Sequence, residues 1–118
     1  MRMWLVPMHL LCRQHFLGNH RELHTMWRSI ELGKYHLIHG HTKKGQIDVS
    51  QIISQHEACE AEMVRRGYNH KSPLPEYAPV VIQDFIDQFG IVPVDIEKSL
   101  KDLHWQYYIH VITEGKNP

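Results

Sequence analysis

The amine at the start of the chain is the group with the most distinctive chemistry. Removal of an initiating methionine generally requires a small second residue, and Arg2 is bulky, so we expect Met1 to be retained. An α-amine has a pKa of about 7.7–8.0, so part of it is uncharged near neutral pH. The uncharged amine is a nucleophile toward an aldehyde-like carbon, with which it forms a Schiff base. Arg2 would lower the amine pKa further if both groups lay in one site.

Histidines offer a second kind of chemistry, metal binding, and the chain has 11 of them. His20 and His24 are four residues apart, a spacing that can chelate from one helix face, and His39 and His41 form another possible pair. The two pairs could meet as a zinc site, but ligand spacing alone is a weak indication. The order His-Arg-Glu-Leu-His also differs from the zinc metalloprotease motif. We therefore expect no metal and no other cofactor, with a histidine-based metal protein as an alternative.

Other routes to catalysis have little support in the sequence. The two cysteines, Cys12 and Cys59, are far apart and form no Cys-x-x-Cys pair, so we expect buried thiols. The chain contains neither a Gly-x-Ser-x-Gly nucleophile elbow nor a glycine-rich phosphate loop.

Charge is unevenly distributed although the formal net charge is zero. Residues 1–44 hold seven basic and two acidic side chains, and residues 45–118 hold six basic and eleven acidic ones. A basic N-terminal portion suits an anionic partner such as a phosphate backbone. The two portions could equally attract each other within the fold, and charge alone leaves both interpretations open.

Length and composition predict one domain spanning residues 1–118. No apolar run approaches the roughly 20 residues that span a bilayer. The N-terminal segment lacks the apolar core and cleavage site of a signal peptide. We expect a cytoplasmic, monomeric protein with no membrane contact.

The sequence predicts that the secondary-structure elements which position the candidate site residues are helices. A first helix is predicted over residues 7–17, with Gly18 as its stop. A second is predicted over residues 19–32, with Asn19 as N-cap and Glu22 as the capping-box acid three residues later. An apolar stripe with the spacing i, i+3, i+4, i+7 marks its inner face, formed by Leu23, Met26, Trp27 and Ile30.

The rest of the chain alternates between connectors and further helices. Residues 34–47, with two glycines, are predicted to form a loop. The longest helix is predicted over residues 48–67, followed by an extended proline-containing connector over residues 71–79. A short helix is predicted over 80–89 and a last one over 95–108. The expected fold is therefore all-α, a single compact domain of three to four helices with an extended connector.

Particular residues of this chain carry a resemblance to a known family. Arg2, Gln14-His15 and Arg21-Glu22-Leu23 resemble the N-terminal pattern of the pyrimidine-dimer DNA glycosylases, the endonuclease V family first known from bacteriophage. The intervals of 13 residues from arginine to histidine and 7 from histidine to glutamate match that family. Residues 62–69, Glu-Met-Val-Arg-Arg-Gly-Tyr-Asn, resemble the end of its long helix. Weaker similarity extends to Tyr107-Tyr108, where the family has an aromatic DNA-contacting cluster.

The resemblance implies a metal-free DNA repair glycosylase that also cleaves abasic sites. The α-amine of Met1 would attack C1′ of the damaged nucleotide, and Glu22 would stabilise the cationic intermediate and help to remove the C2′ proton. The partner would be damaged double-stranded DNA, from which a nucleotide is flipped. The residues to which the resemblance assigns DNA binding are Arg2, His15, Arg21, Arg28 and Tyr107.

Each of these residues also has a structural explanation. Glu22 could be only a capping acid, His15 a core histidine, and Arg21 and Arg28 solvated surface. The aromatic residues near Tyr107 could belong to the core. A non-catalytic nucleic-acid-binding module is therefore a further alternative.

The sequence also departs from the family pattern at three places. Gly18-Asn19-His20 stands where the family has an acid, His24-Thr25 where it has an arginine, and methionine where its first residue is often threonine. The lesion is therefore left open between a cyclobutane dimer, another modified base and an abasic site.

Overall fold

The protein is built from helices in all of its described part. The computed structural model describes residues 2–5, 7–70, 72–98 and 101, and contains no strand there. This confirms the all-α prediction. The elements are a 3₁₀ turn η1 (Met8–Leu10), helix α1 (Arg13–Glu31), helix α2 (Tyr35–Lys43), a 3₁₀ turn η2 (Val49–Gln51), helix α3 (Ile52–Arg66) and helix α4 (Ala78–Phe89).

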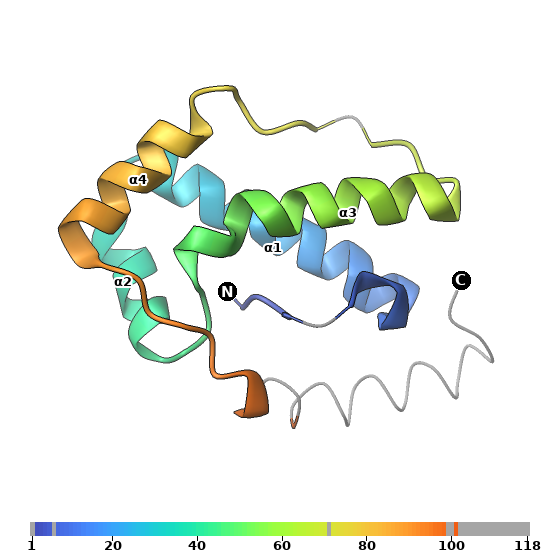
Figure 1. Ribbon diagram of the computed structural model, residues 1–118, viewed down its shortest axis with the longest axis horizontal. Coiled ribbons are helices and arrows are strands. Elements are labelled where there is room, and N and C mark those ends of the chain that lie inside the picture. The colour runs from blue at the N-terminus through green and yellow to red at the C-terminus, as the bar shows by residue number, and fades with distance from the viewer. Residues whose placement is uncertain (1, 6, 71, 99–100, 102–118) are drawn as a thin grey trace.

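Helix α1 is the central element of the fold. It contacts α2, α3 and α4, and α3 crosses it over much of its length (Figure 1). Helices α2 and α4 lie at one end of the molecule, and the chain returns to α4 from the far end of α3 through an extended connector (Figure 1). The predicted stripe on α1 is confirmed as core, because Leu23, Met26, Trp27 and Ile30 are all buried.

The prediction of two short helices over residues 7–17 and 19–32 is wrong. Residues 8–10 form only a 3₁₀ turn, and α1 then runs without interruption from Arg13 to Glu31 through Gly18. A glycine inside a helix costs only about 1 kcal/mol relative to alanine, which tertiary packing readily offsets. The prediction that residues 48–67 form the longest helix is also wrong, since α1 has 19 residues and α3 has 15.

Asn19 explains why the helix continues at the position where a cap was expected. Its side chain is buried and accepts a hydrogen bond from the Trp4 backbone N–H at 3.3 Å, while its amide contacts the Met8 sulfur at 3.6 Å. These partners come from a distant segment, so the side chain is not needed to cap a helix. Glu22 therefore lies in a helix interior, and the capping-box interpretation of Glu22 is wrong.

The predicted loop over residues 34–47 contains helix α2. Ile38 and Thr42, four residues apart, are both buried on its inner face, so packing overrides the weak helix propensity of Gly40. The turn that follows α2 ends at Gly45, whose φ of +69° suits glycine. The backbone carbonyl of Gly45 accepts a hydrogen bond from the Asp95 N–H at 2.8 Å.

The second half of the described chain follows the predictions more closely. Asp48 caps η2 by accepting a hydrogen bond from the Ser50 N–H at 3.0 Å, and Gly67 ends α3 with φ +77°. Helix α4 ends before Gly90 as expected, although Pro79 belongs to its first turn and not to the connector. Most of the helix predicted over residues 95–108 lies outside the described residues.

Two further predictions concern single residues and the membrane. Cys12 and Cys59 are both buried free thiols, as expected. None of the helices in the described part of the chain has the length and hydrophobicity that crossing a lipid bilayer demands.

Candidate active site

The N-terminal segment is held against the middle of α1. The Met3 N–H donates to the Gln46 carbonyl at 2.9 Å, and the Met3 side chain is fully buried. One residue later, the Trp4 N–H donates to Asn19 Oδ1. Residues 2–5 are thus fixed between α1 and the turn that precedes α3. Two predicted site residues, Met1 and Tyr107, lie outside the described residues.

One face of α1 receives this segment. Seven residues make almost two helical turns, so His15 and Glu22 lie on the same face, about 10 Å apart along the axis, with Asn19 between them. The Trp4 ring meets the His15 ring edge-on at 6.4 Å between centroids, and the Arg2 guanidinium lies 5.3 Å from the Trp4 ring centroid. The structure therefore brings Arg2 and His15 together through Trp4, and places the half-buried Glu22 one turn beyond Asn19.

His15 is mostly enclosed. It is 9% exposed, and its Nδ1 lies 3.0 Å from the Cys12 sulfur. Such burial leaves little of the ring available to a large ligand. Sequence reasoning missed Trp4 and Asn19 at this site. Trp4 could have been chosen from the sequence because it is an aromatic residue two positions after Arg2. For Asn19, no local sequence pattern distinguishes a buried asparagine inside a helix from an N-cap.

Arg21 and Arg28 extend a solvent-facing stripe of α1. They are seven residues apart, so they share a face, and both are exposed together with Thr25 between them. Arg28 is paired with Glu31 on the next turn, at 2.5 Å, and Glu31 also accepts a hydrogen bond from the Tyr77 hydroxyl. Arg21 is the nearer of the two arginines to Glu22 along the helix.

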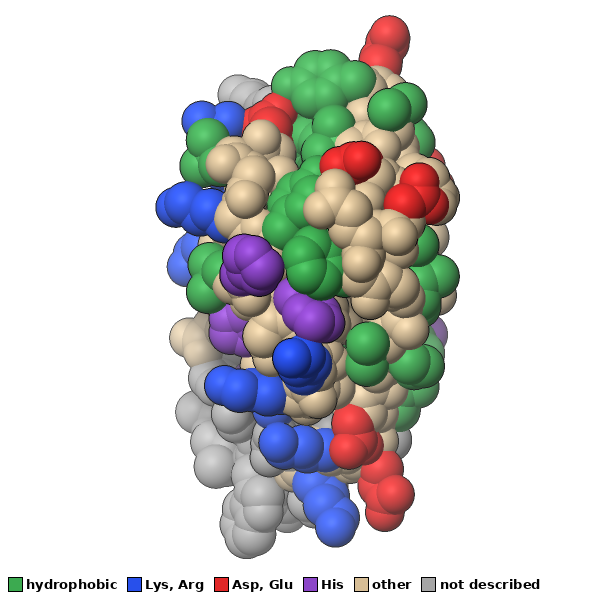
Figure 2. Space-filling model, turned by 90° about the vertical axis from the view of Figure 1, so that its left-hand side faces the viewer, with side chains coloured by type: hydrophobic (Ala, Val, Ile, Leu, Met, Phe, Trp, Pro, Cys, Tyr) green, Lys and Arg blue, Asp and Glu red, His purple; other side chains and the backbone are tan. Residues whose placement is uncertain are grey.

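Basic side chains also gather elsewhere on the surface. Lys and Arg side chains lie along one edge and the lower end of the face that contains α2 and α4, with histidines beside them (Figure 2). Three exposed lysines lie at the two ends of α2, namely Lys34, Lys43 and Lys44. These basic side chains of residues 1–44 are therefore accessible to solvent and are not buried in the core.

The segment that resembles the end of the family's long helix has a structural role. Arg66 donates to Glu62 at 2.5 Å, to the Leu11 carbonyl at 2.7 Å and to the Met8 carbonyl at 3.1 Å. The Arg66 side chain is fully buried, and Glu62 is 7% exposed and also accepts from Arg65. We call Glu62 and Arg66 the α3 clamp. The clamp attaches η1, and with it the N-terminal segment, to α3.

The α3 clamp should make the free energy of unfolding depend on pH in the acid range. Hydrogen bonds from Arg65 and Arg66 lower the pKa of Glu62 from 4.5 to about 2. A carboxyl whose pKa is depressed by folding stabilises the protein above its ordinary pKa, and this contribution is lost as the pH falls toward the folded value. The stability difference between the wild type and Glu62→Gln should therefore shrink between pH 4.5 and about 2, as measured by urea unfolding. A constant difference across this range would contradict the assignment.

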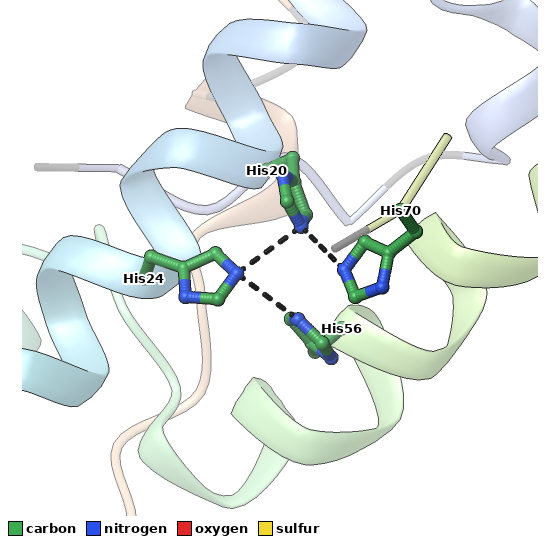
Figure 3. A group of neighbouring side chains, drawn as sticks. All are labelled: His20, His24, His56 and His70. Atoms are coloured by element: carbon green, nitrogen blue, oxygen red, sulfur yellow. Dashed lines mark hydrogen bonds between the residues drawn. The ribbon is translucent and has the colours of Figure 1, made fainter. Parts of the chain in front are cut away.

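Four histidines converge on the other flank of the buried face of α1. His20 and His24 come from α1, His56 from α3 and His70 from the segment after α3 (Figure 3). One ring nitrogen from each lies within 4.8 Å of those from all the others. Burial, followed by repulsion from the neighbouring histidines, lowers the pKa of His20 to about 4, and burial also lowers those of His24 and His56.

The histidine pairing expected from the sequence is only half right. His20 and His24 lie on the same face of α1 and belong to one group. His39 and His41 lie on α2 and are not part of this group. Instead, His41 Nδ1 lies 2.9 Å from the Gln46 side-chain oxygen, and the His39 ring packs on Phe89. His56 and His70 could not be chosen from the sequence, because no local spacing connects them to α1.

Comparison with known proteins bears on the N-terminal part of the chain. The family model described as pyrimidine dimer DNA glycosylase matches residues 1–76. The chain belongs to the pyrimidine dimer DNA glycosylase family. The match covers the part of this glycosylase-family protein that contains Arg2, His15, Glu22 and the α3 clamp, and ends just before α4. Neither the curated proteins nor the solved structures gave a match.

Proposed function

We propose that this protein removes a damaged pyrimidine from double-stranded DNA and cleaves the resulting abasic site, with the α-amine of Met1 as nucleophile. Family membership supports the glycosylase activity and the DNA substrate. The observation that carries the proposal is the fixing of residues 2–5 on the α1 face that holds Glu22. Action as a monomer in the cytoplasm is part of the same proposal.

The proposed reaction needs one nucleophile and one base. The amine nitrogen attacks C1′, the glycosidic bond breaks and the base departs with the bonding electrons. The nitrogen passes a proton to the departing base, the bond from C1′ to the ring oxygen opens as that oxygen takes a proton from water, and a protonated imine joins the protein to the sugar. A carboxylate takes a proton from C2′, and the electrons released expel the 3′ phosphate. Hydrolysis of the remaining imine by water frees the protein.

Glu22 suits the role of this base. It has no capping function in the interior of α1, and it is half-buried on the side of the helix where the N-terminal segment runs. A carboxylate there also stabilises the positive charge of the imine by direct attraction. We therefore assign Glu22 the proton transfer from C2′.

DNA binding in this proposal relies on Arg2 in the N-terminal segment and on the arginines of the solvent-facing stripe of α1. Arg2, Arg21 and Arg28 contact phosphates, which determine position and affinity more than sequence preference. Tyr107 adds an aromatic contact. The burial of His15 suits a supporting role for Trp4 and Arg2 better than extensive contact with DNA.

Borohydride trapping tests the nucleophile. Borohydride reduces an imine to a stable amine, so the protein should become covalently joined to DNA that contains an abasic site or a pyrimidine dimer. Acetylation of the N-terminal amine, or addition of one residue before Met1, should abolish the adduct on denaturing gels because the proposed nucleophile is then blocked or displaced. A matched extension at the C-terminus is the control and should leave trapping unchanged.

The outcomes separate the competing assignments. An adduct that persists after the N-terminal amine is blocked would contradict the assignment of Met1. Salt-sensitive binding to undamaged DNA without any adduct on a panel of lesions would instead identify a non-catalytic DNA-binding module.

A further inference from the structure

We propose that His20, His24, His56 and His70 form a structural zinc site in which one Zn²⁺ ion is bound by their four Nε2 atoms. The four side chains come from α1, α3 and the segment after α3, and their rings point toward a common centre (Figure 3). This group lies apart from the N-terminal segment, so it forms a second site in addition to the proposed catalytic one.

The distances between the nitrogens fit tetrahedral coordination. Zinc binds histidine nitrogen at about 2.0–2.1 Å, which places neighbouring ligand atoms of a tetrahedron about 3.3–3.4 Å apart. The Nε2 atoms of His20 and His70 are 3.1 Å apart, those of His24 and His20 are 3.2 Å apart, and those of His56 and His24 are 3.1 Å apart. Small ring rotations would equalise the remaining separations, which reach at most 4.8 Å.

Hydrogen bonds alone satisfy this arrangement poorly. An uncharged imidazole has either one proton or one lone pair at Nε2, so each Nε2 can serve one good partner in the ring plane. Here His20 Nε2 has two close nitrogen neighbours, and so does His24 Nε2. At most two of the three nitrogen–nitrogen contacts can therefore be hydrogen bonds at one time. A cation at the centre accepts all four lone pairs at once, which removes the conflict.

The surroundings of His56 add an independent indication. His56 is 2% exposed, and its other ring nitrogen, Nδ1, lies 3.0 Å from the Glu60 carboxylate. Histidines that bind metals almost always donate this second N–H to a carboxylate, a carbonyl or water, which orients the ring and increases its basicity. Glu60 is therefore the outer partner of His56, whose Nε2 also lies 3.2 Å from the Ser72 carbonyl oxygen and would exchange that contact for the ion.

The ligand set indicates both the metal and its role. Four imidazoles in tetrahedral geometry suit Zn²⁺. Four protein ligands leave no open position for water or substrate, which is typical of a structural site. The ion would join α1 to α3 and to the segment after it, on the flank of α1 away from Glu22, and would stabilise the helix that presents Glu22 without taking part in the reaction.

Metal content and affinity of the full-length protein test the proposal. The chelated protein should take up one Zn²⁺ per chain, with a thermal unfolding midpoint that rises by several degrees in excess zinc because zinc binds only the folded form. Co²⁺ should give the visible absorption of a tetrahedral site with nitrogen ligands. Failure to bind zinc, or binding without thermal stabilisation, would overturn the proposal.

Three variants locate the site without relying on the buried His56. His70→Ala removes one half-buried ligand and should weaken zinc binding by more than about 100-fold, whereas Glu60→Gln removes only the outer partner and should weaken it by about 10–100-fold. His36→Ala, at an exposed histidine of α2 outside the group, is the matched control and should bind zinc as the wild type does. Wild-type affinity in His70→Ala, or loss of affinity in His36→Ala, would contradict the assignment.

Discussion

Glu22→Gln should reduce cleavage of DNA containing an abasic site by about 10²–10⁴-fold, the range over which a positioned acid or base contributes to catalysis. The change preserves the size of the side chain but removes both its negative charge and its ability to take the C2′ proton. Because Glu22 caps no helix end and lies at the edge of the core, the fold should be retained. Single-turnover cleavage, followed on gels, measures the effect on chemistry separately from binding.

A matched control is available on α3. Glu57 is exposed, so Glu57→Gln removes the same charge at a position outside the proposed site and should cleave at the wild-type rate. Circular dichroism and thermal unfolding of both variants would exclude loss of structure as the cause. Normal cleavage by Glu22→Gln would show that the assigned mechanism is wrong, whatever the fate of the borohydride adduct.

Glu62→Ala should lower the free energy of unfolding by about 3–5 kcal/mol, because it leaves the buried guanidinium of Arg66 without its carboxylate. For a chain of this size, the thermal midpoint should fall by more than about 10 °C. Urea unfolding at neutral pH gives the free energy directly. The same substitution loosens η1, which Arg66 holds through two carbonyls, so the N-terminal segment should lose part of its fixed position.

Arg65 provides the comparison for this prediction. It bonds to the same carboxylate as Arg66, but its side chain is 54% exposed, and exposed ion pairs contribute about 0–1 kcal/mol. Arg65→Ala should therefore cost less than 1 kcal/mol. Equal effects of Glu62→Ala and Arg65→Ala would mean that burial of Arg66 does not determine the contribution of the α3 clamp.

Features that depend on local periodicity could be predicted from the sequence. The apolar spacing from Leu23 to Ile30 identified the buried face of α1, and glycines at 67 and 90 marked two helix ends correctly. The family resemblance predicts Arg2, His15 and Glu22 as site residues. In the structure, Arg2 and His15 both contact the Trp4 ring. The confirmed predictions, the buried face of α1 and the two helix ends, share one cause, since each depends on residues close together in the chain.

The failures also share a cause, which is the contribution of distant partners. Asn19 has the sequence signature of a cap, yet contacts from residues 4 and 8 keep it inside a continuous helix. Helix α2 forms despite Gly40 because burial of the Ile38 side chain in the core stabilises it. The four-histidine group combines α1 with residues 56 and 70, and no spacing rule relates positions so far apart.

The turn at Gly45 and Gln46 has a consequence for how the chain can vary. Its two successive carbonyls hold Met3 on one side and Asp95 on the other, so the segments near both ends of the described chain are fastened to a single bend. A Cβ atom at Gly45 would lie 2.8 Å from that of Asp95. Turns between helices are ordinarily where proteins accept inserted residues. In this protein, lengthening that turn would displace both segments at once, so natural variants should keep its length.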